Sequence, residues 1–454
     1  MGSLFTSLLN STNALQVYGR VFNVVQNNVT NANTPGYVKQ DQILTAEPFD
    51  PSVGISGGVS LGPLQSSRSL YLEHAVRVQS GLLGNSQQSL TDLSQIEPLF
   101  DITGKAGVPG AINGFFNAFS QLSVNPNDQV SRQNILDTAG RVAEAFRQNA
   151  LGIKQAGVNT DGEIRDAVSS INELAQHIAD INRHYRANAN TNDAGLDAQF
   201  YSALENLSGV ADFSVVKISD GSLSVFLGGQ TPLVIGDHVF PISADFSSAQ
   251  TAILDSAGKD ITAQLQNRPG TLGASLQVKN VTLPGYQTSL DGVAKAFADQ
   301  VNTTLAQGLD RNGASPITNL FSYNATVGAA YTLSIANITP DEIAAASAGA
   351  PGGNGNALAI AQLANTPTVN GFTFLQAYGN LAGVVGRDVS DARQATSIGQ
   401  DLVNQAKLRR ADASSVSLDE EAAKLLQFQQ AYQAVGKLVG VLNSLTDTVL
   451  SILQ

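Results

Sequence analysis

The chain contains no cysteine and no tryptophan, and only one methionine among its 454 residues. Without cysteine it can form no disulfide, no thiolate metal site and no cysteine nucleophile. The absence would also suit a protein that crosses into an oxidising exterior while unfolded, although many cytosolic proteins share it. Disulfide scaffolds and thiol enzymes are therefore excluded.

Basic residues are scarce, with 25 Lys and Arg against 37 Asp and Glu and a net charge of -12. Nucleic acids and anionic membranes attract clusters of Lys and Arg, and no basic run occurs here, so we expect neither as a partner. No stretch approaches 18 consecutive apolar residues, so no membrane-spanning helix is expected. The start MGSLFTSLLN has neither the basic region nor the apolar core of a cleaved signal peptide.

Both ends of the chain have apolar residues at alternating spacings of four and three, the rhythm of helices that pack as coiled coils. At the amino end these positions are Leu4, Leu8, Ser11, Leu15, Tyr18, Phe22, Val25, Val29 and Ala32. At the carboxyl end they are Leu425, Phe428, Tyr432, Val435, Val439, Leu442, Thr446, Val449 and Leu453. We therefore predict a long amphipathic helix at each end.

These two helices carry almost no charge. Arg20 is the only charged residue before Lys39, and Lys437 and Asp447 are the only ones from Leu425 onward. A helix on the surface of a soluble protein normally carries Lys and Glu on its outer face. We therefore expect the terminal helices to be buried between subunits of an assembly.

A turn follows the first helix. The helix should end near Asn33, because Thr34 precedes a proline and is displaced from helical geometry. Thr34-Pro35-Gly36-Tyr37 places Pro and Gly in the central positions of a type II turn. An extended stretch through Ile43 and Leu44 should lead into a Gly-rich segment of loop and short strand, from Gly54 to Pro63.

The predicted assembly interface combines both helices and this turn. Its residues are Leu4, Leu8, Leu15, Phe22, Val29, Pro35, Gly36, Tyr37, Leu425, Phe428, Tyr432, Val435, Val439 and Leu442.

The middle of the chain is predicted as helical rods with a β unit inserted. Helical patterns cover Leu70 to Ile96, a helix opened by Pro109, one or two heptad rods between Ala139 and Ile178, and a long helix from about Phe372 to Ala413. Short runs rich in β-branched residues between Phe213 and Ile242 indicate antiparallel hairpins. Helix should resume from Leu290 to Leu309, and an isolated strand is expected at Tyr331 to Ile338.

The fold class is thus mainly α with a β insertion. The terminal helices pair in a coiled-coil-like assembly domain of residues 1–66 plus 415–454. A helical rod domain covers 67–207 plus 271–414, and a small antiparallel β domain covers 208–270.

Three motifs that could carry chemistry lack the context they need. Gly54-Ile55-Ser56-Gly57-Gly58 matches a nucleophile elbow, which requires a strand before it and a helix directly after it, but its flanks are Gly-rich. His177, Asp180 and His184 share one helix face and could in principle bind a metal, yet no second shell is evident. Gly104-Lys105 lacks the spacing of a phosphate-binding loop. We therefore expect no enzyme activity, catalytic residue, cofactor or metal.

Two motifs carry a family resemblance. Asn27-Asn28-Val29-Thr30-Asn31-Ala32-Asn33-Thr34-Pro35-Gly36-Tyr37 resembles the NNxxNxxTPGY signature of the bacterial flagellar axial proteins, which form the rod, hook and hook-associated parts of the flagellum. Ser417-Leu418-Asp419-Glu420-Glu421 and the segment from Leu425 to Ala434 are similar to the LDEE ending of the hook-associated branch at the hook–filament junction. Gly36-Tyr37-Val38-Lys39-Gln40 resembles that branch as well.

The resemblance implies an extracellular structural protein, exported through the flagellar type III apparatus, that assembles as a ring of subunits between hook and filament. Its partners would be its own copies, the hook protein, and the next hook-associated protein or the flagellin side. An export chaperone would cover the carboxyl-terminal helix. Two alternatives stay open, another axial protein of the hook or distal rod, and an enzyme carried on a flagellar scaffold.

Overall fold

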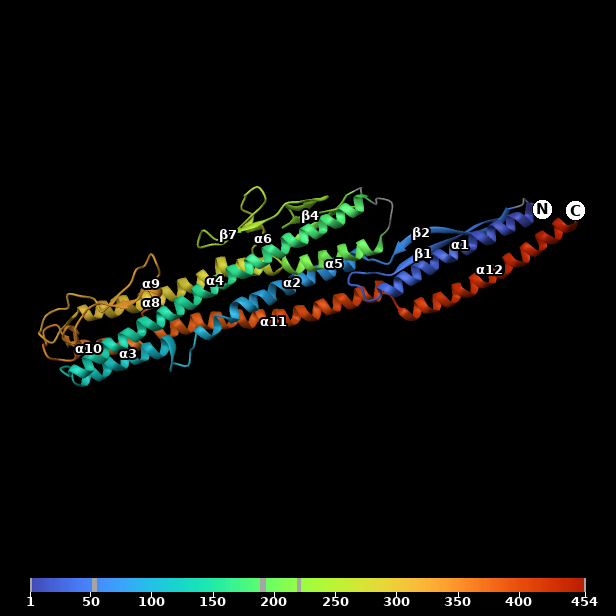
Figure 1. Ribbon diagram of the computed structural model, residues 1–454. Helices are drawn as coiled ribbons and strands as arrows, with labels where there is room; N and C mark the ends of the chain where they lie inside the picture. The colour runs from blue at the N-terminus through green and yellow to red at the C-terminus, as the bar shows by residue number, and fades with distance from the viewer. Residues whose placement is uncertain (1, 51–54, 188–192, 219–221, 453–454) are drawn as a thin grey trace.

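The computed structural model describes residues 2–50, 55–187, 193–218 and 222–452. The molecule is elongated, and both chain ends lie at the same end of it (Figure 1). The terminal helices α1 (Gly2–Asn31) and α12 (Leu418–Ile452) run side by side there. The predicted pair of terminal helices is therefore present within one subunit.

The rod consists of helices from several parts of the chain. They are α2 (Leu70–Ser94), α3 (Gly107–Val124), α4 (Gln129–Ala187), α5 (Ala194–Val210), α6 (Thr262–Leu265), α7 (Thr271–Gln277), α8 (Leu283–Ala306), α9 (Ala329–Thr332), α10 (Gly355–Gln362) and α11 (Phe374–Ser414). The two predicted heptad rods are one helix of 59 residues, α4. The helix predicted from Leu290 begins earlier, because a π-helical turn, Val278–Thr282, joins α7 to α8.

Local capping explains several helix starts. The Ser69 hydroxyl accepts a hydrogen bond from the Leu72 amide at the start of α2, and Thr373 and Gln376 form a capping box at the start of α11. At the start of α12, Ser417 makes only half of such a box with Glu420. Its hydroxyl does accept from the Glu420 amide at 3.4 Å, but the Glu420 carboxylate bonds Lys39 instead.

The strands form several small antiparallel sheets. β1 (Gln40–Asp50) pairs with β2 (Ile55–Ser66) in a long hairpin beside α1. The predicted β unit contains a four-stranded sheet in chain order followed by a two-stranded one. Their strands are β3 (Phe213–Lys217), β4 (Leu223–Leu227), β5 (Thr231–Ile235), β6 (His238–Val239), β7 (Ser243–Asp245) and β8 (Ala252–Leu254).

Two strand predictions were wrong. The segment Gly54 to Pro63 was expected as loop with a short strand, but from Ile55 it belongs to the 12-residue strand β2; Gly54 lies outside the described residues. The isolated strand at Tyr331 to Ile338 is instead the end of α9 followed by β11 (Ser334–Ile335), which pairs with β10 (Phe321–Ser322). One further two-residue pair joins β9 (Gly308–Leu309) to β12 (Ala346–Ser347).

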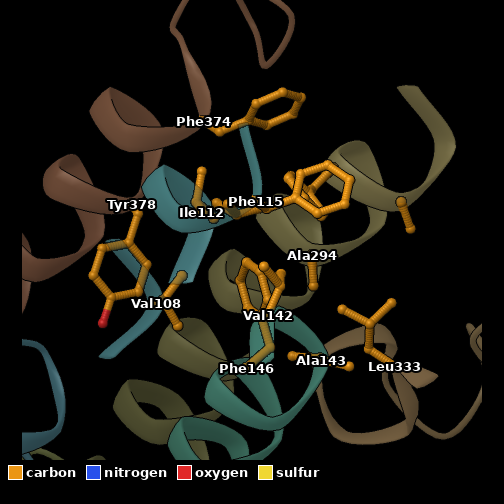
Figure 2. Close-up of a cluster of buried hydrophobic side chains, with 14 of the residues drawn as sticks. Val108, Ile112, Phe115, Val142, Ala143, Phe146, Ala294, Leu333, Phe374 and Tyr378 are labelled. Atoms are coloured by element: carbon orange, nitrogen blue, oxygen red, sulfur yellow. The ribbon is translucent and has the colours of Figure 1, made fainter. Parts of the chain in front are cut away.

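Two hydrophobic cores lie along the rod. One packs α3, the first half of α4, α8, α10 and the first half of α11 around aromatic rings such as Phe115, Phe146 and Phe374 (Figure 2). The ring centroids of Phe115 and Phe297 lie 5.4 Å apart in this core. The other joins the second half of α4 to α5, α7 and the β unit. The predicted fold class, mainly α with a small β insertion, is confirmed. The β unit shares its core with α4 and α5, and the domain boundaries remain predictions.

Candidate functional site

The predicted apolar stripes of the two terminal helices face each other. The rings of Tyr18 and Phe428 lie 5.9 Å apart, and those of Phe22 and Tyr432 lie 6.0 Å apart. All four residues belong to the heptad positions read from the sequence. The two helices therefore use these stripes to pack on each other within one subunit.

This packing covers the predicted residues only in part. Leu442 is the one residue of the predicted assembly interface that is buried, and the heptad residues Ser11 and Val25 outside that set are buried as well. Intermediate exposure is found for Leu4, Leu8, Leu15, Phe22, Phe428, Val435, Val439, Gly36 and Tyr37. Exposed positions are Val29, Pro35, Leu425 and Tyr432. Whether these residues form the assembly interface stays a prediction.

Helix α1 has a second packed face that the sequence analysis missed. Its most buried side chains are Val17, Val21 and Asn28, while Val25, also buried, belongs to the predicted stripe. Asn10 and Asn13 lie on the same side at 100° per residue and donate to the backbone carbonyls of Gly57 and Val59 in β2. Val17, Val21 and Asn28 follow this second line, which packs on the β1–β2 hairpin.

A buried polar cluster ties the two chain ends together. The Asn28 amide donates to the Gln40 carbonyl at 2.8 Å and to the Glu421 carboxylate at 3.0 Å. The Asn28 side-chain oxygen accepts from the Gln40 amide at 3.0 Å and from the Tyr37 hydroxyl at 2.9 Å. Asn28, Gln40 and Glu421 are all buried. Residues of the amino-terminal and carboxyl-terminal motifs therefore meet in one cluster.

Charges surround this cluster. Burial, and secondarily the Glu421 carboxylate, raise the pKa of Tyr37 to about 12, although Asn27 donates a hydrogen bond to its hydroxyl. Lys39 pairs with Glu420 at 2.9 Å, and Lys424 pairs with Asp41 at 2.5 Å. Each ion pair joins the segment after the turn to the start of α12, so the contacts reinforce the cluster.

The turn at 34–37 has the predicted geometry. The Tyr37 amide donates to the Thr34 carbonyl at 3.1 Å, and Gly36 has φ +75°, as the third position of a type II turn requires. The turn also lies against α5. A Cβ atom added to Gly36 would be 2.3 Å from the Ala198 carbonyl oxygen. Glycine is therefore required both by the backbone conformation and by the close approach of α5.

The pair α1–α12 leaves a second apolar stripe uncovered. On α12 the residues Ala434, Leu438, Val441, Leu445, Thr448 and Ile452 repeat at spacings of four and three, and we call them the outer stripe. Leu438, Val441, Leu445 and Ile452 are 49%, 57%, 47% and 76% exposed. Phe5 and Leu9 are likewise exposed on α1. A single subunit therefore presents a large apolar surface.

One described helical stretch, within Phe374–Ile452, is apolar enough over 18 residues to cross a membrane by length and composition alone, and 6% of that window is buried. This differs from the expectation from consecutive apolar runs, because Gln, Asn, Ser and Thr interrupt those runs without adding charge. The heptad spacing of the outer stripe favours packing against helices.

The three chemical motifs lie in unremarkable surroundings. Ser56 belongs to strand β2 opposite Phe49, without the required strand-to-helix turn, and Gly54 lies outside the described residues. His177 and His184 are exposed on α4, and Asp180 pairs with Arg183 at 3.1 Å. Gly104-Lys105 lies in the bend before α3. Among the described residues, no group of three or more potential metal ligands comes together.

Comparison with known proteins agrees with this arrangement. Residues 93–321 match the family model described as the flagellar hook-associated protein FlgK helical domain. Flagellar hook-associated protein 1 of Bacillus subtilis is 25% identical over an alignment of 502 positions, which covers 99% of both chains. The protein of the same name in Salmonella typhimurium is 23% identical over 562 positions, with all of both chains covered. Both alignments are longer than the chain, so the relatives carry segments that it lacks.

A solved structure shares the fold. The flagellar hook junction protein FlgK from Burkholderia pseudomallei matches with a TM-score of 0.68 at 17% identity, over 77% of this chain and all of that one.

The matches to flagellar proteins, together with the elongated helical rod and the paired chain ends, define the class, a structural protein of the bacterial flagellum. Within that class, the family model covers half of the chain. The chain belongs to the flagellar hook-associated protein FlgK family.

Proposed function

We propose that the protein forms the junction between the hook and the filament of the bacterial flagellum. The observation that carries this proposal is the uncovered apolar surface of the terminal helix pair, together with the family membership. Burying an apolar side chain of this size contributes roughly 1.5 to 3 kcal/mol when it was fully exposed. The half-exposed outer stripe therefore provides several kcal/mol for binding other subunits.

The outer stripe suits a ring of identical subunits joined through α1 and α12. The partners in this proposal are further copies of the chain, the hook protein on one side, and the next hook-associated protein or flagellin on the other. Such a protein would be extracellular, exported by the flagellar type III apparatus. An export chaperone would cover α12 beforehand, because a free apolar stripe of this length favours aggregation.

Residues 1–66 plus 415–454 would form the assembly domain in this proposal. Residues 67–207 plus 271–414 would form the rod, and 208–270 the β unit. The role is structural, and nothing in the proposal needs a catalytic residue or a cofactor. The competing reading is a hook or distal rod protein, which would occupy a different length of the axial structure.

The first experiment removes the gene. Cells without the protein should build hooks but carry no attached filaments, and the wild-type gene should restore attachment. A tagged copy should be found at the hook–filament boundary. A tagged copy spread along the hook or rod would favour the competing axial protein.

A second experiment tests the surface. Leu438→Asp and Val441→Asp each place a charge in the outer stripe, where burial without a partner costs several kcal/mol. We expect both variants to lose filament attachment. Asn443→Asp is the matched control, because it adds the same charge at an exposed position of α12 that lies about 160° around the helix from Val441. Normal attachment with the stripe variants would refute the assignment of this surface.

A further inference from the structure

Arg68 lies between β2 and α2, where the terminal pair meets the rod, and its side chain is 5% exposed. All three guanidinium nitrogens have acceptors. Nε donates to Asp197 at 2.7 Å, Nη1 to Glu73 at 2.5 Å, and Nη2 to the Gly36 carbonyl at 2.7 Å. The guanidinium carbon also lies 4.0 Å from the ring centroid of Tyr201.

We propose that Arg68 is a positioning residue for assembly, which holds the turn at 34–37 on the rod and so fixes the direction of the terminal helix pair. The proposal rests on the assembly function above. It assigns a specific task to a residue outside both motifs that carry the family resemblance.

The rod holds Arg68 in place independently of the turn. Glu73 lies in α2, and Asp197 and Tyr201 lie in α5, so two of the three hydrogen bonds and the ring contact are made to rod residues. Only the bond to the Gly36 carbonyl reaches the terminal segment. The guanidinium is therefore oriented before the turn docks, and the turn needs to supply one carbonyl oxygen.

Helix α11 adds basic residues to the charged group around Arg68. Arg410 donates to Glu73 at 3.0 Å and to Glu205 at 2.7 Å, and Lys407 pairs with Glu205 at 2.9 Å. Burial raises the pKa of Glu205, but hydrogen bonds from Lys407 and Arg410 outweigh it and hold the pKa below its usual range. These ion pairs therefore link α2, α5 and α11 near the end of α11, where the chain continues into α12.

The rod has a second arginine that can support Glu73 when Arg68 is changed. Arg77 Nη1 is buried without a hydrogen-bond partner in the described part of the chain. Burial lowers the pKa of the Arg77 guanidinium, and the negative charges of Glu73 and Glu205 partly offset this. Glu73 would thus keep Arg410 and gain Arg77, so we expect the rod to remain folded in Arg68 variants.

Lysine cannot replace this arginine. A guanidinium presents donors in a rigid planar fork that can reach several acceptors and stack on a ring, whereas an ammonium is a single point of charge. Arg68→Lys should keep a positive charge near Glu73 and Asp197 and lose the bond to Gly36. If Arg68→Lys releases the turn, a positive charge near Glu73 and Asp197 is not enough to hold it. Arg68 then positions the turn rather than only neutralising the two carboxylates.

Trypsin can measure whether the turn is docked. Arg20 and Lys39 are the only tryptic sites before Arg68. Lys39 is held where the terminal segment meets the rod, because its backbone amide donates to the Ser414 carbonyl and its carbonyl accepts from the Ser67 amide, both at 2.9 Å. Cleavage after Lys39 in the free full-length subunit, followed by intact-mass spectrometry, therefore reports release of the turn.

We expect slow cleavage after Lys39 in the wild type and a rise of about tenfold to a hundredfold in Arg68→Lys and Arg68→Met, the range expected for a lost charged hydrogen bond. The matched control is Arg393→Lys, because Arg393 is exposed on α11 and lies 3.9 Å from its nearest acid, Glu97. Cleavage after Lys279, which bonds Asp161 in the rod, should stay slow in every variant and verifies that the rod is folded.

Filament attachment is measured with the same variants. We expect fewer attached filaments with Arg68→Lys and normal attachment with Arg393→Lys. Cleavage after Lys39 that is unchanged by Arg68→Lys, or already fast in the wild type, would overturn the proposal. Faster cleavage with normal attachment would overturn the positioning role while leaving the junction function intact. Loss of the junction function itself would appear in the gene deletion, independently of the proteolysis.

Discussion

Gly36→Ala is the sharpest test of how the turn docks on the rod. Gly36 has φ +75°, a conformation that costs a residue with a side chain about 1 to 2 kcal/mol. The added Cβ would also lie 2.3 Å from the Ala198 carbonyl oxygen, a separation that the turn can relieve only by moving away. That movement breaks the hydrogen bond from Arg68 to the Gly36 carbonyl, a loss of about 1.5 to 3 kcal/mol.

We therefore expect Gly36→Ala to destabilise the docked turn by about 2.5 to 5 kcal/mol in total. Two other glycines separate the contributions. Gly229 has φ +78° and open space around it, so Gly229→Ala should show only the conformational cost, about 1 to 2 kcal/mol. Gly19 lies inside α1 with nothing near its Cβ position, so Gly19→Ala should stabilise α1 by roughly 0.5 to 1 kcal/mol.

Amide hydrogen exchange measures each change in stability locally, at residues 28–40 for Gly36→Ala, at β4 and β5 for Gly229→Ala, and along α1 for Gly19→Ala. Filament attachment gives the functional consequence, which we expect to be severe only for Gly36→Ala. A loss at residues 28–40 no larger than the loss that Gly229→Ala causes in its own hairpin would refute the close contact with Ala198.

Three further predictions use other parts of the structure. Burial raises the pKa of Asp92 to about 6, against about 3.9 in the unfolded chain, so the stability of the wild type should fall as the pH rises from about 4 to about 6. Asp92→Asn should remove that fall and increase the free energy of unfolding by up to about 3 kcal/mol at pH 7, measured by urea unfolding. Asn28→Ala should abolish filament attachment because it leaves Glu421 without its amide donor, whereas Asn23→Ala, at an exposed position of α1 outside the cluster, should be tolerated. Ser56→Ala and His177→Ala should leave attachment and motility unchanged, and a defect in either would revive the enzyme or metal-site alternative.

The sequence predicted the terminal helices well because their apolar residues keep one spacing over eight or more positions. It did not predict that α1 packs on two sides. Val17 and Val21 belong to a second line that contains Asn10, Asn13 and Asn28, and its polar members disguise it as an outer face. The amides are internal because each one satisfies a backbone group of the hairpin, a pairing that spacing alone cannot reveal.

The hairpin strand β2 was missed for a related reason. Its glycines remove the alternation of apolar and polar side chains by which a strand is recognised. In the structure a Cβ on Gly62 would lie 3.0 Å from the Ile43 side chain, and one on Gly57 would lie 3.1 Å from Phe49. The opposite strand therefore covers the space that side chains on β2 would have filled. The packing of β1 side chains over the glycines of β2 depends on the pairing of the two strands, so the sequence of β2 alone does not reveal it.

The contact between the turn at 34–37 and the rod depends on residues that no sequence pattern connects. Arg68 stands alone in its segment, and its acceptors come from positions 36, 73 and 197. The motif residues Asn28 and Tyr37 were recognisable by resemblance, but their partner Glu421 lies 393 residues from Asn28. Only the folded chain shows that the two motifs complete one cluster.

That cluster makes the two chain ends depend on each other. Glu421 is a fully buried carboxylate, and a buried charge that loses its hydrogen-bond partners is strongly destabilising. Its amide donor is Asn28, and the same Asn28 also holds Gln40 and Tyr37 at the beginning of the hairpin. The amino-terminal segment and α12 therefore stabilise their docked positions together, and the apolar surface proposed for assembly is complete only when both are in place.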